Sequence, residues 1–258
     1  MPVTASSLRR AWLPPLIGVH RMPLNVTLTH FAGAVTCLED IQRVMDLPAL
    51  IECQLIQDNG LSTGSPPLRN DHIQRFSTDT PDILQHLTLP SLKELRIFCE
   101  CQSKLLIPFF TRSSCNLTRL HIAHSSLEEA LILSEYQATL EKLIIDAGWT
   151  DIGIIDSYPN LYQLTIRLAE NYRSPPQDEI KKITTHLRNR TRKKGNDRRV
   201  TSLRISCPGR RSIHQGFDYV RALRMNGLDA LESGGLQVAV YQEARTWLNS
   251  KLSVHELC

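Results

Sequence analysis

The chain has 258 residues, of which 41% are hydrophobic and 22% are charged, and its formal net charge is +4. It contains enough apolar side chains for one elongated domain or one large globular core. No apolar run approaches the roughly 18 residues of a membrane span, so the sequence argues against a transmembrane protein.

The N-terminal segment, residues 1–23, is expected to be poorly ordered. Its run from Ala11 to Val19 follows two arginines in the manner of a signal peptide, but Pro14-Pro15 interrupts the run and no convincing cleavage site follows. The seven cysteines are an odd number, which favours buried reduced thiols over a disulfide framework. These features predict an intracellular protein of the cytoplasm, the nucleus or both.

Residues 24–241 carry a recurring pattern: a leucine, two variable residues, an aliphatic residue, one variable residue and then Ile or Leu. It occurs at Leu50/Cys53/Leu55, Leu92/Leu95/Ile97, Leu117/Leu120/Ile122, Leu140/Leu143/Ile145, Leu161/Leu164/Ile166 and, with valine first, Val200/Leu203/Ile205. The first positions are 42, 25, 23, 21 and 39 residues apart. The three inner values match the roughly 20 to 29 residue period of leucine-rich repeats, and each outer gap is expected to hold a degenerate repeat or an insertion.

Each repeat is typical of a short strand. In residues 92–98, the alternation places Leu95 and Ile97 on the core side of a strand. Glu94 and Arg96 fall on the opposite side, which is displayed.

The segments between the strands are typical of helices or tight turns. Thr36 and Glu39 form a capping-box pattern ahead of apolar residues at helical spacing. Thr80-Pro81 has the order of an N-cap residue followed by a proline in the first helical position. This alternation predicts an α/β fold, specifically an irregular leucine-rich-repeat solenoid with parallel strands on one face and helices or turns on the other. An unrelated α/β domain is the alternative.

The C-terminal part is typical of a terminating element. Gly234-Gly235 is a stop signal, and residues 236–240 alternate as a final strand. Residues 242–258 are predicted to form a polar-faced helical cap, since an exposed end of a stack invites aggregation.

Two segments, residues 87–97 and 109–122, resemble the leucine-rich C-terminal region of F-box proteins that are abundant in mushroom-forming fungi. The likeness covers roughly residues 24–241, and its most specific element is the Arg-Ser-Ser-Cys-x-Leu-x-x-Leu run that ends at Leu120. In that family an F-box binds the adaptor subunit of a cullin-based ubiquitin ligase, and the repeats recruit the substrate. The resemblance implies a monomeric, non-catalytic protein-binding module that needs no cofactor.

The displayed positions of stacked strands are the candidate contacts for an unknown protein substrate. Strands in register, about 4.8 Å apart, align these positions in columns. The columns are Glu94, Arg119, Lys142 and Gln163; Arg96, His121, Ile144 and Thr165; and Phe98, Ala123, Asp146 and Arg167. The alternative is a solvated face with no ligand.

Basic residues concentrate in one part of the chain. Residues 181–211 contain twelve Lys or Arg and one acidic residue. The densest part lies in or beside a predicted insertion at about residues 181–199, with a basic patch of Arg188, Arg190, Arg192, Lys193, Lys194, Arg198 and Arg199. This run is interpreted as a solvated loop, with a nuclear-localisation or docking signal and a nucleic-acid adaptor as alternatives. Aromatic residues are absent between Tyr172 and Phe217, which disfavours nucleic acid.

One motif carries a rival, catalytic reading. Gly60-Leu-Ser62-Thr-Gly64 matches the nucleophile elbow of serine hydrolases. A helix must follow that turn directly, whereas Ser65-Pro66-Pro67 favours extended structure. The hydrolase reading, with Ser62 as nucleophile, therefore stays a weak alternative to a protein without enzymatic activity.

A metal site is also considered and set aside. Cys99, Cys101, Cys115, His121 and His124 include ligands of the types that zinc prefers. The one-residue gap between the first two cysteines is shorter than structural zinc sites use. The strand pattern also turns Cys99 inward and His121 outward, so no metal is predicted.

The first testable prediction concerns the ligase adaptor. Residues 1–23 are too short for an F-box, and their adjacent prolines are incompatible with its helices. We expect that this chain does not bind the adaptor, which would dock only to a longer form that carries an F-box. Size-exclusion chromatography of the purified mixture tests this expectation, and co-elution at micromolar concentration would contradict it.

Overall fold

The computed structural model describes residues 8–13, 19, 27–57, 66–100, 103–123, 139–147, 158–168, 185, 200–207, 232 and 236–242. The chain separates into two compact units, a first lobe of residues 1–140 and a second lobe of residues 141–258. Every strand pairing described within either lobe is parallel, so the fold is α/β with parallel sheets.

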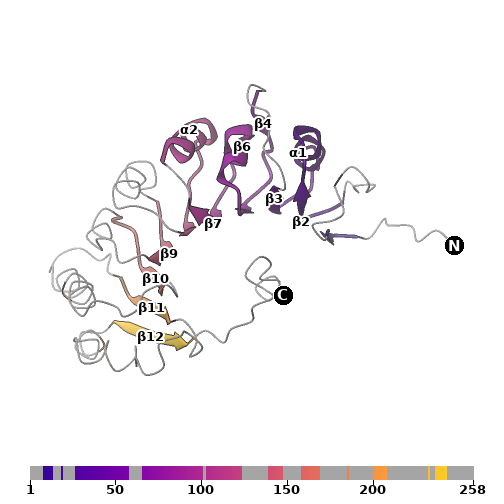
Figure 1. The fold of residues 1–258 in the computed structure, drawn as a ribbon. Helices are drawn as coiled ribbons and strands as arrows, with labels where there is room; N and C mark the ends of the chain where they lie inside the picture. Colours follow the sequence, from indigo (N-terminus) through magenta and orange to yellow (C-terminus); the bar gives the residue numbers. More distant parts are fainter. Residues whose placement is uncertain are drawn as a thin grey trace. The chain divides into compact units, whose positions relative to one another are not determined.

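The first lobe is built on parallel strands that follow one another nearly in chain order (Figure 1). Its main sheet has the order β1-β2-β3-β5-β7-β8. These strands are β1 (Arg10–Trp12), β2 (His30–Val35), β3 (Glu52–Gln57), β5 (Arg75–Thr78), β7 (Glu94–Glu100) and β8 (Arg119–Ala123). Two short strands, β4 (Leu68–Arg69) and β6 (Leu87–Thr88), pair with each other in a separate parallel sheet.

Helices lie on one side of this main sheet. They are α1 (Leu38–Met45), the 3-10 helix η3 (Pro81–His86) and α2 (Ser103–Ser113). Figure 1 shows α1 and α2 on the same side of the strands, as expected for parallel strands, which need a crossover between them. The other side, here called the strand face, bears no helix among the described residues of this lobe.

The recurring leucine positions form the core, as the sequence predicts. Every described side chain at the motif positions is at most 4% exposed. Register aligns them: Leu95 lies opposite Leu120 in the first lobe, and Leu164 lies opposite both Leu143 and Leu203 in the second. Burying a Leu or Ile side chain contributes about 1.5 to 3 kcal/mol, so this repeated burial is a main source of stability.

Two further repeats, which the motif did not identify, occupy the N-terminal part of the first lobe. The 42-residue gap contains β5, where Phe76 lies between Cys53 and Leu95 in the pairing register. Ahead of it, β2 places Phe31 opposite Cys53. Gly33 takes an aliphatic position here because a Cβ atom would lie only 2.9 Å from the Phe31 ring, too close for any other side chain without a shift.

One backbone oxygen in each repeat accepts two N–H groups from the next repeat. The carbonyl oxygen of Thr29 accepts hydrogen bonds from the N–H groups of Ile51 and Glu52 at 2.8 and 3.0 Å. The same paired contact recurs at the carbonyl oxygens of Arg9, Ile51, Gln74, Lys93, Glu141 and Tyr162. These contacts start the strand that follows each of these seven carbonyl groups at the same relative position, and they therefore set the register of these strands.

In the repeat that contains β5, a buried asparagine side chain adds four hydrogen bonds to the backbone. Asn70 donates to the carbonyl oxygens of Met45 and Leu47 at 2.8 and 3.3 Å. Its own oxygen accepts from the N–H groups of His72 and Ile73 at 2.8 and 3.0 Å. All four bonds are made by one side chain, so Asn70 joins the end of α1 to the start of β5.

The helix α1 begins one residue later than the sequence predicts, whereas the cap of η3 lies at the predicted residue. The N-cap residue of α1 is Cys37, and the carboxylate of Asp40 accepts from both the N–H and the hydroxyl of Thr36 at 3.1 and 2.9 Å. Asp40 thus takes the place predicted for Glu39, because it is the third residue after the true cap. Thr80 caps η3 ahead of Pro81, as predicted, although its side chain makes no capping hydrogen bond.

Residues 10–12 form β1, within the segment predicted to be poorly ordered. This strand pairs with β2, with Arg10 opposite His30 and Trp12 opposite Ala32. The prolines at positions 14 and 15 follow the strand and so do not interrupt its pairing. An edge strand needs backbone contacts on one side only, which is why so short a segment suffices.

The second lobe holds a parallel sheet in the order β9-β10-β11-β12. Its strands are β9 (Lys142–Ala147), β10 (Gln163–Leu168), β11 (Ser202–Cys207) and β12 (Gln237–Gln242). The predicted final strand at residues 236–240 corresponds to β12. The predicted cap at 242–258 lies, apart from its first residue, outside the described residues, and so does the insertion at 181–199, apart from residue 185.

Removing one side chain of the leucine column tests this packing. Leu120→Ala should lower the free energy of unfolding by about 2 to 5 kcal/mol, because Leu120 is fully buried opposite Leu95 and the cavity cannot close fully. Urea denaturation followed by circular dichroism measures the loss. Gln85→Ala, at an exposed position, is the matched control and should leave the midpoint of urea denaturation unchanged. An equally mild effect of Leu120→Ala would contradict the placement of Leu120 in the core.

Candidate binding face of the parallel sheets

The strand face of the first lobe brings most of its predicted contact residues into register. Glu94 on β7 lies opposite Arg119 on β8, and Arg96 lies opposite His121. Both pairs match the predicted columns. In the second lobe, Lys142 lies opposite Gln163 in the same way.

The third predicted column is wrong in the first lobe. Ala123 pairs with Glu100 and not with Phe98, because the register shifts between Ile97 and Glu100. Such an irregularity places extra residues on one strand, and nothing in the side-chain alternation announces it. In the second lobe the corresponding pair, Asp146 and Arg167, does lie in register, although only the backbone of these two residues is described.

Two residues that were predicted to be displayed are buried instead. Glu94 is buried because Nε of Arg96 donates to its Oε1 at 2.6 Å and Nε of Arg119 lies 3.4 Å from the same oxygen. His121 is buried with its ring edge-on to the ring of Phe98, at a centroid distance of 5.5 Å. The alternation of the strand therefore gives the side on which a residue lies, but not its exposure.

In the repeats that the motif missed, Glu52 likewise lies between two basic side chains, those of Arg75 and His30. Glu52 accepts from Nε of Arg75 at 2.8 Å, and Nη2 of Arg75 lies 2.6 Å from the same oxygen. Nε2 of His30 approaches Glu52 from the other side at 3.6 Å. These residues could have been found only by aligning Leu28 and Ile73 with the repeat leucines.

The ring of His30 lies between the hydroxyl of Thr29 and the carboxylate of Glu52. Burial lowers the pKa of His30 below its usual value, and although the carboxylate of Glu52 acts in the opposite direction, it is the smaller influence. The ring shares a hydrogen bond of 2.8 Å with the hydroxyl of Thr29.

Together these residues form a continuous line, here called the charged row. In register order it consists of Arg10, His30, Glu52, Arg75, Glu94 and Arg119. The line beside it, here called the second row, consists of Trp12, Ala32, Gln54, Ser77, Arg96 and His121. Alternating charges of this kind stabilise neighbouring strands and fix the directions of the arginine side chains.

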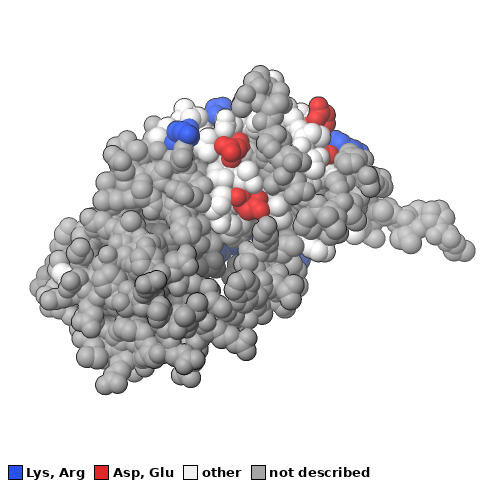
Figure 2. All heavy atoms as spheres, in the orientation of Figure 1, with Lys and Arg blue, Asp and Glu red and all other residues white. Residues whose placement is uncertain are grey.

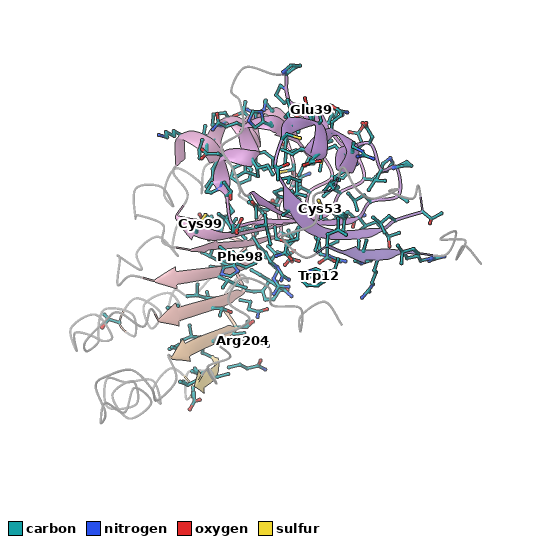
Figure 3. All side chains as sticks on the ribbon, turned by 45° about the vertical axis from the view of Figure 1, so that its right-hand side comes forward. Trp12, Glu39, Cys53, Phe98, Cys99 and Arg204 are labelled. Atoms are coloured by element: carbon teal, nitrogen blue, oxygen red, sulfur yellow. The ribbon has the colours of Figure 1, made fainter. Side chains whose placement is uncertain are left out.

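Two large aromatic side chains are exposed on the strand face of the first lobe. Trp12 is 50% exposed and Phe98 is 37% exposed. Figure 3 shows both on the side of the sheet away from α1, which carries Glu39. Exposed tryptophan and arginine on one surface are typical of protein-binding sites.

On the face of the first lobe that Figure 2 shows, the described charged side chains do not form a patch of one sign. Figure 2 shows acidic and basic side chains separated by uncharged ones over the described atoms of its visible face. The basic patch predicted between Arg188 and Arg199 lies outside the described residues.

The second lobe presents a different set of side chains on its strands. Nζ of Lys142 lies 5.8 Å above the ring centre of Tyr162, a cation–π contact at an exposed position. Arg204 is exposed on β11, opposite Thr165 of β10 (Figure 3). Among the described side chains, this face therefore combines the basic residues Lys142 and Arg204 with the ring of Tyr162.

The described residues were searched for a cysteine nucleophile and for a cluster of metal ligands. Burial raises the pKa of the Cys115 thiol to about 11 and raises that of Cys53 further, so neither thiol forms a nucleophile at neutral pH. Within the described residues, no three His, Cys, Asp or Glu side chains gather as metal ligands. Ser62, Cys101 and His124 lie outside the described residues.

No helix in the described part of the chain is long and apolar enough to cross a membrane. Comparison of the chain with protein-family models, with characterised proteins and with solved structures finds no match.

Glu94 offers a direct test of the charged row. Glu94→Gln should lower the free energy of unfolding by about 1.5 to 3 kcal/mol, because two guanidinium groups lose the carboxylate that they share in a buried position. Thermal and urea unfolding measure the effect. Glu141→Gln, an exposed residue at the start of β9, is the control; equal stability of the two variants would mean that the row contributes nothing to the fold.

Proposed function

We propose that the chain is a non-catalytic protein-binding module of the leucine-rich-repeat type. Its partner is a protein, and its binding surface is the strand face, with contacts from Arg75, Arg96, Arg119, Trp12 and Phe98. The strand face is chosen because it carries both exposed aromatic residues and ordered arginines. That conjunction is the single observation on which the assignment rests.

The repeat type is supported by three recurrent features of different physical origin. Buried residues recur at the same three positions of each repeat. One carbonyl oxygen per repeat accepts two N–H groups from the next. Strands follow one another in parallel and nearly in chain order. A fold in which repeats pack only against their neighbours would generate all three.

The binding role is supported by the difference between the two sides of the first lobe. Its helix side is occupied by α1, η3 and α2, which cover the apolar core. Its strand face carries guanidinium groups whose directions are fixed by carboxylates. Ordering these long side chains before binding lowers the entropy cost of association.

The biological setting follows from the family resemblance. We propose that the strand face selects a substrate for a ubiquitin ligase, as the repeats of fungal F-box proteins do, inside the cytoplasm or nucleus. Adaptor binding belongs in this proposal to a form that carries an F-box. A monomer suffices, because the charged row is complete within one copy of the first lobe.

Reversal of charge on the strand face tests the proposal. The double variant Arg96→Glu and Arg119→Glu should lose partner capture, because it turns two attractive contacts into repulsive ones. Affinity purification with quantitative mass spectrometry compares it with the native chain, with adaptor and cullin peptides scored separately. The matched control is Arg43→Glu with Lys104→Glu, which makes the same charge change at exposed helix positions.

Circular dichroism must show that both double variants are folded. Trp12→Ala provides an independent probe that adds no charge to the row. Capture that survives in both strand-face variants, with the fold intact, would contradict the proposal.

A further inference from the structure

We infer that the partner segment recognised by the first lobe is an extended acidic peptide that carries one large apolar residue. This inference rests on the proposed protein-binding function and specifies its ligand. The peptide crosses the strands, with its carboxylates at Arg75, Arg96 and Arg119 and its apolar residue at Trp12.

The charge of the strand face is the first support. The described side chains of the two rows comprise four arginines, Arg10, Arg75, Arg96 and Arg119, against two carboxylates, Glu52 and Glu94. Counting only these arginines and carboxylates, the rows carry an excess of two positive charges. An acidic segment is the complementary partner.

The depth of the charges is the second support. The side chain of Arg75 is 43% exposed while its partner Glu52 is 16% exposed. The side chain of Arg119 is 34% exposed while Glu94 is 11% exposed. An approaching ligand therefore meets guanidinium groups first, and the carboxylates lie beneath them.

The way in which the arginines are held is the third support. Arg96 and Arg119 both turn Nε toward Glu94, at 2.6 and 3.4 Å. Contact through Nε restrains the plane of a guanidinium group. A planar fork held in this way suits bidentate binding of a carboxylate.

The spacing of the strands sets the length of the segment. Arg75 and Arg119 are two strand steps apart, which is about 10 Å and matches three residues of extended chain. Trp12 is four steps from Arg96, about 19 Å, which matches about six residues. Between them the second row has Ala32, Gln54 and Ser77, and two of these three side chains are short.

A nucleic acid fits these rows less well than a peptide. Glu52 and Glu94 flank Arg75 in the charged row, so the positive charges are interrupted, whereas a phosphate backbone is bound best by a continuous set of cations. A peptide places its carboxylates singly.

Selection from a random peptide library tests the inference on the full chain. A display library of about 12 residues, twice the predicted six-residue span, is panned against the immobilised protein. Enriched sequences should carry at least two Asp or Glu and one large apolar residue about six positions from them. Enrichment of neutral or basic sequences, or no enrichment, would overturn the inference.

Synthetic copies of the enriched peptide then locate the site. Arg96→Gln with Arg119→Gln should weaken binding about tenfold or more in fluorescence anisotropy, and raised salt should weaken it for the native chain. Replacing Asp and Glu of the peptide by Asn and Gln should have the same effect without changing the protein, so the result does not depend on folding of the variant. Arg43→Gln with Lys104→Gln is the matched control.

The outcomes separate this inference from the proposed function. If the strand-face charge reversals abolish protein capture but the acidic peptides do not bind, the ligand class is wrong and the binding face stands. If neither capture nor peptide binding depends on the strand face, both proposals fail. Equal or tighter binding of a single-stranded oligonucleotide at the same arginines would also overturn the inference that the ligand is a peptide.

Discussion

The pairing of two N–H groups onto one carbonyl oxygen at the start of each strand is the constraint on which the strand face depends. Because the carbonyl oxygen of Lys93 accepts from Thr118 and Arg119, strand β8 can begin at only one position relative to β7. A slip by one residue would turn Leu120 outward and lose its burial, at a cost of about 1.5 to 3 kcal/mol for each leucine. Backbone and core therefore agree on one register, and the outward side chains inherit it.

The charged row shows how a parallel sheet can carry ions on one side without a large loss of stability. Exposed ion pairs contribute about 0 to 1 kcal/mol, whereas removal of one partner from a buried pair is costly. Glu52 and Glu94 each use one carboxylate oxygen to contact two basic side chains. The guanidinium ends stay nearer to solvent. The same contacts thus compensate the buried carboxylates and orient the arginines.

The sequence predicted the elements whose burial depends on aliphatic side chains. Leu50, Leu95 and Leu164 could be placed in the core because aliphatic residues at fixed spacing have few other uses in strands. The repeat containing Phe76 was missed because its positions hold Ile, Phe and Thr, which satisfy the same geometry with other shapes. A composition rule recognises residue types, whereas the sheet requires only volume and register.

The candidate site was less predictable for a related reason. Alternation assigned Glu94 and His121 to the strand face, yet their burial depends on Arg96 and Phe98, which lie beside them only after the sheet has formed. The register shift after Ile97 is also a property of two strands together. The choice of Asp40 over Glu39 at the start of α1 depended on where the helix begins, and sequence patterns locate that point least well.

A register held by the backbone has a consequence for how such a face can acquire specificity. The strands β5, β7 and β8 cannot slide past one another. The backbone positions 75, 96 and 119 therefore keep their separations when other side chains replace the arginines. Altered recognition must then come from exchanging outward residues, one position at a time, while the inward leucines stay fixed. Length changes are tolerated on the helix side, where the connections between strands already differ from repeat to repeat, as the 19 residues from Ile73 to Leu92 and the 25 from Leu92 to Leu117 show. The strand face is therefore a rigid grid of positions about 4.8 Å apart, in which the side chains determine the ligand and the backbone determines its length.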